Sequence, residues 1–182
     1  MNTSDLWNAQ VGFHKLHPSA FEPKYATQGS ACFDIHACFP SGRCLVKAYS
    51  HNSRPITLLA AADNSGESNH ITIEPNYRVM VPTQLVFDIP DHLSLRLHMR
   101  SGLAIKGGLV LSNAEGIIDS DYTDELMVLV TNTSEIPVRI NHGDRICQGE
   151  FVPVYRPTMV LSVNRPEPKG DRRGGFGSTG KS

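Results

Sequence analysis

Arg100, Ser101 and Gly102 stand together where an alternating apolar segment ends and a short stretch that favours helix begins. Free backbone N–H groups at the start of a helix favour an anion, and the forked guanidinium of arginine matches phosphate oxygens. The serine adds a hydroxyl, and the glycine lets a ligand approach the backbone closely. The three residues therefore suit a phosphate group, with an ordinary surface turn as the alternative.

A second polar segment, residues 111–126, contains a predicted hairpin that turns near residues 114–116. The exposed backbone groups of such a turn, together with the Asn113 amide, could pair with the edge of a nucleobase. Asp119 and Asp121 are two residues apart, so both could face one side of an extended segment. A carboxylate there could orient and deprotonate a water or hold a metal ion through water. A solvated turn is the alternative interpretation.

Two further segments carry groups that could reach a ligand. Gln148 is the odd polar residue beside buried positions in residues 143–151, where a Gly-Asp turn leads into a predicted strand. A routine surface turn is the alternative there. Residues 175–182 match the P-loop pattern G-x-x-x-x-G-K-S, but a P-loop must follow a strand and open a helix, and the sequence ends at Ser182. We therefore expect no P-loop; these residues either fold over a phosphate ligand or are disordered.

The elements that must position these residues are mainly strands. Alternating apolar and polar residues predict strands at residues 71–74, 77–81, 85–89, 93–99 and 136–140. The apolar run at residues 126–130 predicts a strand buried on both faces, and residues 102–106 predict about one helical turn. Residues 56–63 fit either a helix or a strand. Turn signals recur at a spacing of about 8–12 residues, which favours an all-β sandwich or barrel.

The chain divides into a compact body and a basic arm. Its 182 residues are the size of one domain, and we place the body at residues 1–163, with an additional segment at about residues 43–69. From residue 164 to residue 182 the arm is rich in glycine and carries five Lys/Arg against two Asp/Glu. Phe176 is its one large aromatic residue, so the arm cannot build a core of its own.

Composition argues against several classes of protein. Hydrophobic residues make up 40% and charged residues 19%, as in ordinary globular proteins. No apolar run approaches the ~20 residues of a membrane helix, and the N-terminus lacks the pattern of a secretory signal. The formal net charge of −1 gives no support to general nucleic-acid binding. We therefore expect neither a membrane nor a nucleic acid as a partner.

The cysteines and histidines show no spacing typical of metal ligands. Cys32, Cys38 and Cys44 lie six residues apart, and Cys147 is distant from them. Free thiols persist in a reducing compartment, so we expect a cytoplasmic location, in a cell or in an infected host cell. The eight histidines are scattered, and we interpret them as solvent-exposed or core residues.

Five segments, in order, resemble the five motifs of the trimeric dUTP diphosphatase (dUTPase) family. They are YATQGSACFDI (25–35), MRSGLAIKGG (99–108), GIIDSDYTDEL (116–126), GDRICQGEFVP (143–153) and RRGGFGSTG (172–180). The resemblance covers about residues 20–180. It implies an all-β, jelly-roll-like subunit with one short helix, a homotrimer with shared active sites, and hydrolysis of dUTP to dUMP and diphosphate with Mg²⁺.

The resemblance also implies roles for single residues. Asp119 would be the base that orients the attacking water onto the α-phosphorus, and Tyr122 would pack against the deoxyribose and exclude a 2′-hydroxyl. Asp34 would help to hold the metal ion through water. The residues implied for uracil are Asn113, Ile117, Ile118 and Met127, and those for the phosphates are Arg100, Ser101, Gly102 and Gln148.

The arm would close over a site built from the other subunits. Phe176 would cover the uracil, and the arm's phosphate contacts would come from Arg172, Arg173, Gly177 and Ser178. The family usually has an arginine five residues before the phenylalanine, but here that residue is Asp171, which leaves Arg172 and Arg173 as alternatives for the γ-phosphate. The other departures are Cys32 and Asp124 in place of glycine and Met99 in place of proline.

The implied chemistry is physically consistent. Mg²⁺ and arginine would mask the triphosphate charge and stabilise the transition state, and a small hairpin would exclude the C5 methyl of thymine by its shape. A dCTP deaminase of the same fold is the nearest alternative, and its chemistry would need a carboxylate beside the cytosine amine. A regulatory or binding protein on a dUTPase scaffold, using residues 43–69, is the second. A structural jelly-roll protein is the third, and it should not need the arm.

Overall fold

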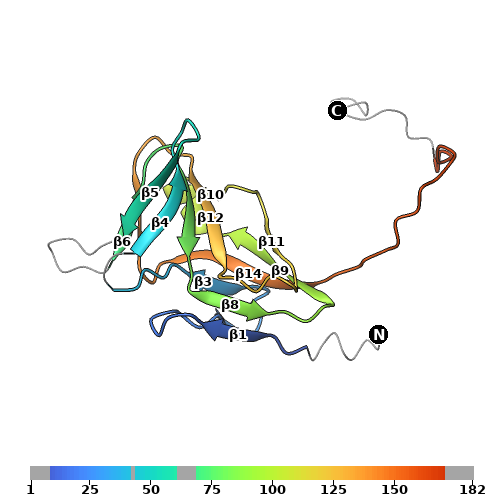
Figure 1. Cartoon of the computed structure of the whole chain (residues 1–182), viewed down its shortest axis with the longest axis horizontal. Helices are drawn as coiled ribbons and strands as arrows, with labels where there is room; N and C mark the ends of the chain where they lie inside the picture. Colours follow the sequence, from blue (N-terminus) through green and yellow to red (C-terminus); the bar gives the residue numbers. More distant parts are fainter. Residues whose placement is uncertain (1–8, 42–43, 61–68, 171–182) are drawn as a thin grey trace.

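The computed structural model describes residues 9–41, 44–60 and 69–170, and its body is built from two five-stranded antiparallel sheets (Figure 1). The first sheet contains, in spatial order, β10 (Leu109–Leu111), β12 (Met127–Asn132), β7 (Arg78–Pro82), β4 (Cys44–Tyr49) and β5 (Pro55–Ala60). The second sheet contains β11 (Gly116–Ile118), β9 (Leu93–Met99), β14 (Arg145–Pro153), β3 (Phe33–His36) and β2 (Lys24–Tyr25).

Two small sheets and a short helix complete the described fold. β1 (Gly12–Lys15) pairs with β8 (Leu85–Asp88), and β6 (His70–Ile73) pairs with β13 (Val138–Asn141). Helix α2 (Ser101–Gly107) directly follows β9 and ends at Gly108, whose φ of 62° is the left-handed conformation that glycine adopts readily. Strands with one short helix confirm the predicted all-β fold class.

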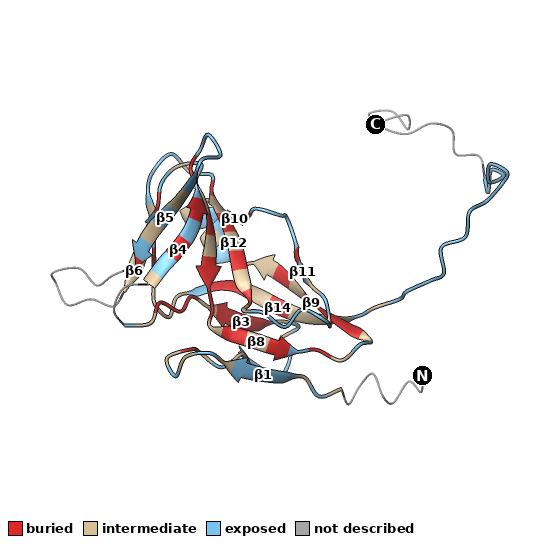
Figure 2. Cartoon of the chain, in the orientation of Figure 1, coloured by how far each residue is buried: buried red, intermediate tan, exposed pale blue. Residues whose placement is uncertain are grey.

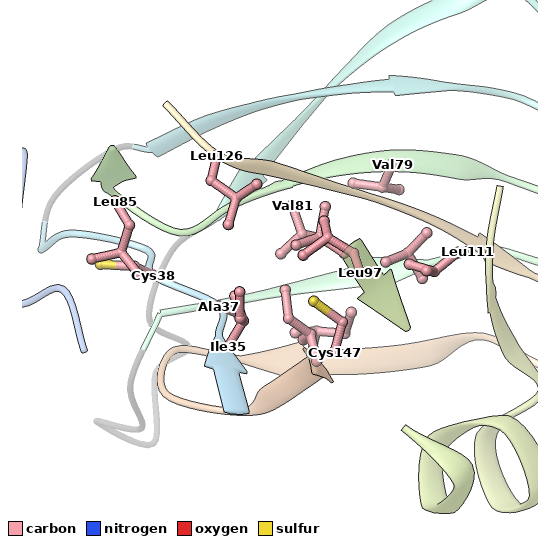
Figure 3. Close-up of a cluster of buried hydrophobic side chains, with 14 of the residues drawn as sticks. Ile35, Ala37, Cys38, Val79, Val81, Leu85, Leu97, Leu111, Leu126 and Cys147 are labelled. Carbon is pink, nitrogen blue, oxygen red and sulfur yellow. The ribbon is translucent and has the colours of Figure 1, made fainter. Parts of the chain in front are cut away.

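The hydrophobic core lies between the two five-stranded sheets (Figure 2). Alternating residues along each strand point inward, so the first sheet contributes side chains such as Val79 and Val81, and the second contributes Leu97. Figure 3 shows these residues packed together with Leu111 and Cys147. The same alternation sends the intervening side chains to the outer faces of the sheets, where they are available for binding.

The prediction that residues 126–130 are buried on both faces is wrong. In β12, Val128 and Val130 are buried in the core, but Met127 and Leu129 on the opposite face are only half-buried. In the described part of the chain no second layer covers this outer face of the first sheet. The apolar side chains there line a surface cleft instead.

Residues 55–60 form the edge strand β5. Of the helix and the strand that were open for residues 56–63, the strand is therefore correct for the described part. β5 pairs with β4 along its whole length, from Cys44↔Ala60 to Tyr49↔Pro55. The described part of the additional segment at residues 43–69 therefore widens the first sheet by extending one of its edges. Residues 42–43 and 61–68 lie outside the described residues.

The last strand ends at Pro153, and residues 155–170 are exposed and lead away from the body (Figure 1). Their large apolar side chains are Tyr155, Met159, Val160, Leu161 and Val163, each more than 80% exposed. The compact part of the described chain thus ends earlier than residue 163. No helix among the described residues is long and apolar enough to cross a membrane.

Candidate active site

A cleft of about 260 Å³ opens where the two sheets meet beside β11. The predicted residues in its lining are Asn113, Ile117, Ile118, Asp119, Tyr122 and Met127. The structure adds Met80, Leu97, Leu111, Gly116 and Leu129, which the sequence reasoning did not assign. The lining is mainly apolar with a few polar groups at its rim, as is typical of small-molecule binding sites. We call this site the cleft.

A tight turn at residues 112–115 carries Asn113 to the rim of the cleft. The Ala114 amide donates to the Leu111 carbonyl at 3.1 Å, and Ala114 has a left-handed φ of 64°. The turn does not close a hairpin as predicted, because β10 pairs with β12 in the first sheet and β11 pairs with β9 in the second. The chain instead crosses between the sheets here, and this crossing opens the cleft.

Gly116 allows β11 to lie directly on the floor of the cleft. A Cβ atom at this position would come within 2.9 Å of the Leu97 side chain, closer than carbon atoms approach in proteins. A larger residue would push β11 away from β9 and change the width of the cleft. The glycine therefore helps to set the size of the cleft.

Asp119 and Tyr122 are joined by a second turn. The Tyr122 amide donates to the Asp119 carbonyl at 3.2 Å, and the Tyr122 hydroxyl donates to the Glu125 carbonyl at 2.9 Å. Asp119 lines the cleft and is exposed, and no hydrogen bond or ion pair among the described residues engages its carboxylate. Burial, assisted by Asp124 and Glu125, raises the pKa of Tyr122, so its phenol stays neutral. The prediction that Asp121 faces the same side as Asp119 is wrong, because the segment turns and Asp121 is absent from the cleft lining.

A separate cluster of charged groups lies on the outer face of the second sheet; it consists of Asp34, Arg100, Arg145 and Gln148, and we call it the charged cluster. Asp34 is 9% exposed, and its carboxylate accepts a hydrogen bond from Arg145 Nη1 at 3.1 Å and a long one from Gln148 Nε2 at 3.5 Å. Arg100 Nε lies 3.4 Å from the same carboxylate, and Arg100 Nη1 donates to the Arg145 carbonyl at 3.0 Å. The carboxylate therefore fixes two guanidinium groups and one amide side by side, in an arrangement suited to phosphate oxygens.

Arg145 was missed by the sequence reasoning. It lies 111 residues from Asp34 along the chain, and only the pairing of β14 with β3 brings the two together. Ser101 and Gly102 begin helix α2 next to Arg100, and both are exposed. The predicted phosphate residues of the described chain thus gather at one end of β9.

The cleft and the charged cluster do not meet within one chain. β11 and β3 are separated by β9 and β14, which places them about 14 Å apart across the sheet. Ile118 is opposite Leu95, whereas Gln148 is opposite His98, which adds about 10 Å along the strands. The backbones of Ile118 and Asp34 are therefore about 17 Å apart, so the cleft and the charged cluster are two separate groups on one chain.

The remaining predicted residues cannot be placed. Arg172, Arg173, Phe176, Gly177 and Ser178 lie outside the described residues. Within the described part of the chain, no group of three or more His, Cys, Asp or Glu side chains could hold a metal ion. Asp34 is the carboxylate expected near a metal ion, and it is already paired with two arginines.

Comparison with known proteins gives consistent matches. A dUTPase family model matches residues 66–180. The deoxyuridine 5′-triphosphate nucleotidohydrolase of Dinoroseobacter shibae is 36% identical over 159 residues, which cover 87% of each chain. That of Desulfitobacterium hafniense is 35% identical over 161 residues, covering 88% of this chain and 87% of the relative.

Solved structures share the fold at lower identity. A mutant dUTPase of Staphylococcus bacteriophage 80alpha with dUpNHpp superposes with a TM-score of 0.71 at 20% identity, covering 94% of this chain and 98% of the other. The dUTPase from phage phi11 of S. aureus gives a TM-score of 0.64 at 18% identity, covering 86% and 98%. These solved dUTPase structures therefore share the fold of this chain.

Proposed function

The chain belongs to the dUTPase family and is a dUTP diphosphatase, and from this premise we propose that it hydrolyses dUTP at sites shared between copies of the chain. The observation that carries the proposal is the separation of about 17 Å between the cleft and the charged cluster, derived from strand spacings. We propose that one nucleotide contacts both groups where the cleft of one copy faces the charged cluster of another. A homotrimer with threefold symmetry would supply three such pairs.

The exposed segment at residues 155–163 supports assembly. Tyr155, Met159 and Leu161 are about nine-tenths exposed, with values of 88%, 91% and 93%. Exposed apolar residues grouped in this way mark an interaction surface. We propose that this segment packs on a second copy of the chain. It would carry the arm, residues 164–182, to an active site other than the one formed by the cleft of its own chain.

In the cleft, the substrate would be recognised by shape and by a few polar groups. The Asn113 amide and the backbone of the turn would pair with the edge of uracil, and the narrow space would exclude a methyl group at C5. The Tyr122 ring would pack against the deoxyribose and leave no room for a 2′-hydroxyl. Ile117, Ile118 and Met127 would surround the base, and Phe176 of an arm would cover it.

The reaction would proceed by water attack on the α-phosphorus. Asp119 would orient a water and take its proton; the new P–O bond forms as the bond to the bridging oxygen breaks, and diphosphate leaves with that oxygen's electrons. Arg100, Gln148 and the amides of Ser101 and Gly102 would hold phosphate oxygens, and Arg145 would keep Asp34 in place. Arg172 or Arg173, with Gly177 and Ser178, would close over the phosphates.

The described residues fit a magnesium ion that is bound mainly by the substrate. Mg²⁺ keeps several waters and usually takes one or two carboxylates plus phosphate oxygens, and Asp34 is the carboxylate next to the phosphate-binding groups. A bound Mg²⁺ would neutralise charge on the triphosphate. Asp34 would reach its water shell, while its ion pairs with Arg100 and Arg145 hold the carboxylate in position.

The cysteines bear on the location of the protein. All four are free, and burial raises the pKa of each thiol, which keeps them protonated and unreactive. Free thiols are typical of a reducing compartment. We propose the cytoplasm, of a cell or of an infected host cell.

Release of diphosphate from dUTP, dCTP, dTTP and UTP, measured with Mg²⁺, tests the proposal. We expect turnover of dUTP and little of the others. Ammonia release from dCTP, or no turnover of dUTP, would contradict it. Light scattering on the same sample should give the mass of three chains.

A further inference from the structure

The outer face of the second sheet carries three basic side chains at every second position: Arg96 and His98 in β9, and Arg100 directly after its last residue. Each of them faces a carboxylate from a different segment. The pairs are Arg96–Glu115 at 3.0 Å, His98–Glu150 at 3.3 Å and Arg100–Asp34 at 3.4 Å. The third pair belongs to the charged cluster, and the middle pair is the one whose basic member is a histidine.

The middle pair lies next to the charged cluster. Gln148 is directly opposite His98 on one side and directly opposite Asp34 on the other, so the three side chains form one row across the sheet. Glu150 is two residues from Gln148 on β14, on the same face and about 7 Å away along the strand. A carboxylate thus stands beside the groups that we assign to the phosphates.

This carboxylate creates an electrostatic problem for a triphosphate. Like charges at such a distance repel each other, and the repulsion is stronger where the groups are partly shielded from water. The side chains of His98 and Glu150 are 39% and 42% exposed, so solvent screens them only in part. A protonated imidazole at 3.3 Å would cancel the charge of Glu150 and turn its oxygen away from the phosphates.

We propose that His98 is a positioning residue that holds and neutralises Glu150, so that the triphosphate can bind beside Gln148 and Arg100. This inference rests on the proposed assignment of those two residues to phosphate binding. His98 touches neither the substrate nor the reacting atoms in this account. It acts on binding through Glu150, and its effect should appear in KM rather than in kcat.

The charged groups around His98 come from several elements. They are Glu150 and Arg145 on β14, Arg96 on β9, Arg100 directly after β9, Asp34 on β3, Lys24 on β2 and Glu115 in the turn before β11. His98 is the one histidine in this group, so a change in KM with pH that depends on residue 98 reports on its imidazole.

The test is a double-mutant cycle on the full-length protein. We expect His98→Asn to raise KM for dUTP by about three- to tenfold at pH 6, with kcat changed by less than about twofold. The same ratio measured at pH 8.5 tests whether the effect depends on a charged imidazole: a ratio that shrinks towards one supports the inference, and a ratio that stays the same contradicts it. The ratio at a fixed pH removes the titration of the substrate itself.

Glu150→Gln supplies the decisive comparison. Alone it should leave KM unchanged or lower it, and in the double variant H98N/E150Q it should return KM to the wild-type value. A double variant that keeps the raised KM would overturn the inference, because His98 would then contact phosphate directly or act by packing. Loss of assembly in both His98 variants by light scattering would also overturn it, because the pair would then join copies of the chain. His51→Asn, in the exposed turn between β4 and β5, is the matched control and should change nothing.

Arg100→Ala separates this inference from the proposed function. If Arg100→Ala leaves KM unchanged, the phosphate assignment itself is wrong. If Arg100→Ala raises KM strongly while His98→Asn does not at either pH, the phosphate assignment stands and only the role of His98 fails.

Discussion

Asp34 lies within β3 and Asp119 directly follows β11, in the same sheet, but the two carboxylates have different surroundings. Asp34 is 9% exposed and engaged by two arginines and a glutamine. Asp119 is exposed at the rim of the cleft, and no side chain of the described residues pairs with it. A carboxylate that is fully engaged by its own protein can position neighbouring groups, whereas one that is free can accept a proton from water. From this comparison we propose that Asp34 positions its neighbours and that Asp119 is the catalytic base.

Replacing the free carboxylate should have the largest effect. We expect Asp119→Asn to lower kcat by about 10²- to 10⁴-fold, with little change in substrate affinity, because the cleft keeps its shape. Single-turnover kinetics together with equilibrium binding of a non-hydrolysable dUTP analogue measure the two quantities separately. Asp121→Asn, outside the cleft lining, is the matched control and should retain turnover. Weak binding with near-normal turnover in Asp119→Asn would assign the residue to recognition instead.

Replacing the engaged carboxylate should affect both binding and stability. Asp34→Asn removes the negative charge between Arg100 and Arg145, so we expect KM to rise about tenfold and the free energy of unfolding to fall by about 1–3 kcal/mol. Urea denaturation measures the second quantity. Asp119→Asn should leave it within about 0.5 kcal/mol of wild type. Equal stability losses in the two variants would remove the distinction between the aspartates.

Two variants of Tyr122 separate the contribution of its aromatic ring to activity and nucleotide preference from the contribution of its hydroxyl. Tyr122→Phe loses only the hydrogen bond to the Glu125 carbonyl, worth about 1 kcal/mol, so kcat/KM should fall by about fivefold or less. Tyr122→Ala also loses the ring, and its preference for dUTP over UTP should decrease. Competition between the two nucleotides measures this preference. An unchanged preference in Tyr122→Ala would place the discrimination elsewhere.

The smallest expected effect is a change in the pH dependence of stability, and it comes from histidines at the edge of the charged cluster. Burial lowers the pKa of His36 and of His142, and the Phe21 ring lies between them at centroid distances of 4.9 and 5.2 Å. The unfolded chain therefore binds more protons below about pH 6.5, so the stability of the fold should decrease as the pH falls through that value. We expect His36→Gln to reduce this loss, measured as the difference in Tm between pH 7.5 and pH 5.5. An identical difference in wild type and variant would show that His36 does not contribute.

Local patterns in the sequence predicted the helix and the strands β6–β9 and β12–β14, because alternation and turn residues act over a few positions. Residues 93–99 form β9 as expected, and the short helix follows them. The Asn113–Tyr122 part of the cleft was also predictable, since its residues are close along the chain. The pairing of Arg145 with Asp34 was not, because it depends on strand register over a long separation. The crossing between sheets at residues 112–115 was missed for a related reason, since a turn looks the same whether or not its flanking strands pair.

The most direct test of a shared site is recovery of activity in mixed assemblies. In this account Asp119→Asn removes turnover and Arg100→Ala weakens phosphate binding, so each variant alone should show little activity at a dUTP concentration near the wild-type KM. After both variants are unfolded, mixed in equal amounts and refolded, about a quarter of the sites should combine an intact Asp119 with an intact Arg100 from different copies, if mixing in a symmetric ring is random. We predict recovery of about a quarter of the wild-type rate of dUTP hydrolysis. No recovery from assemblies shown by mass spectrometry to be mixed would mean that both residues serve one site within a single chain, and would contradict the account.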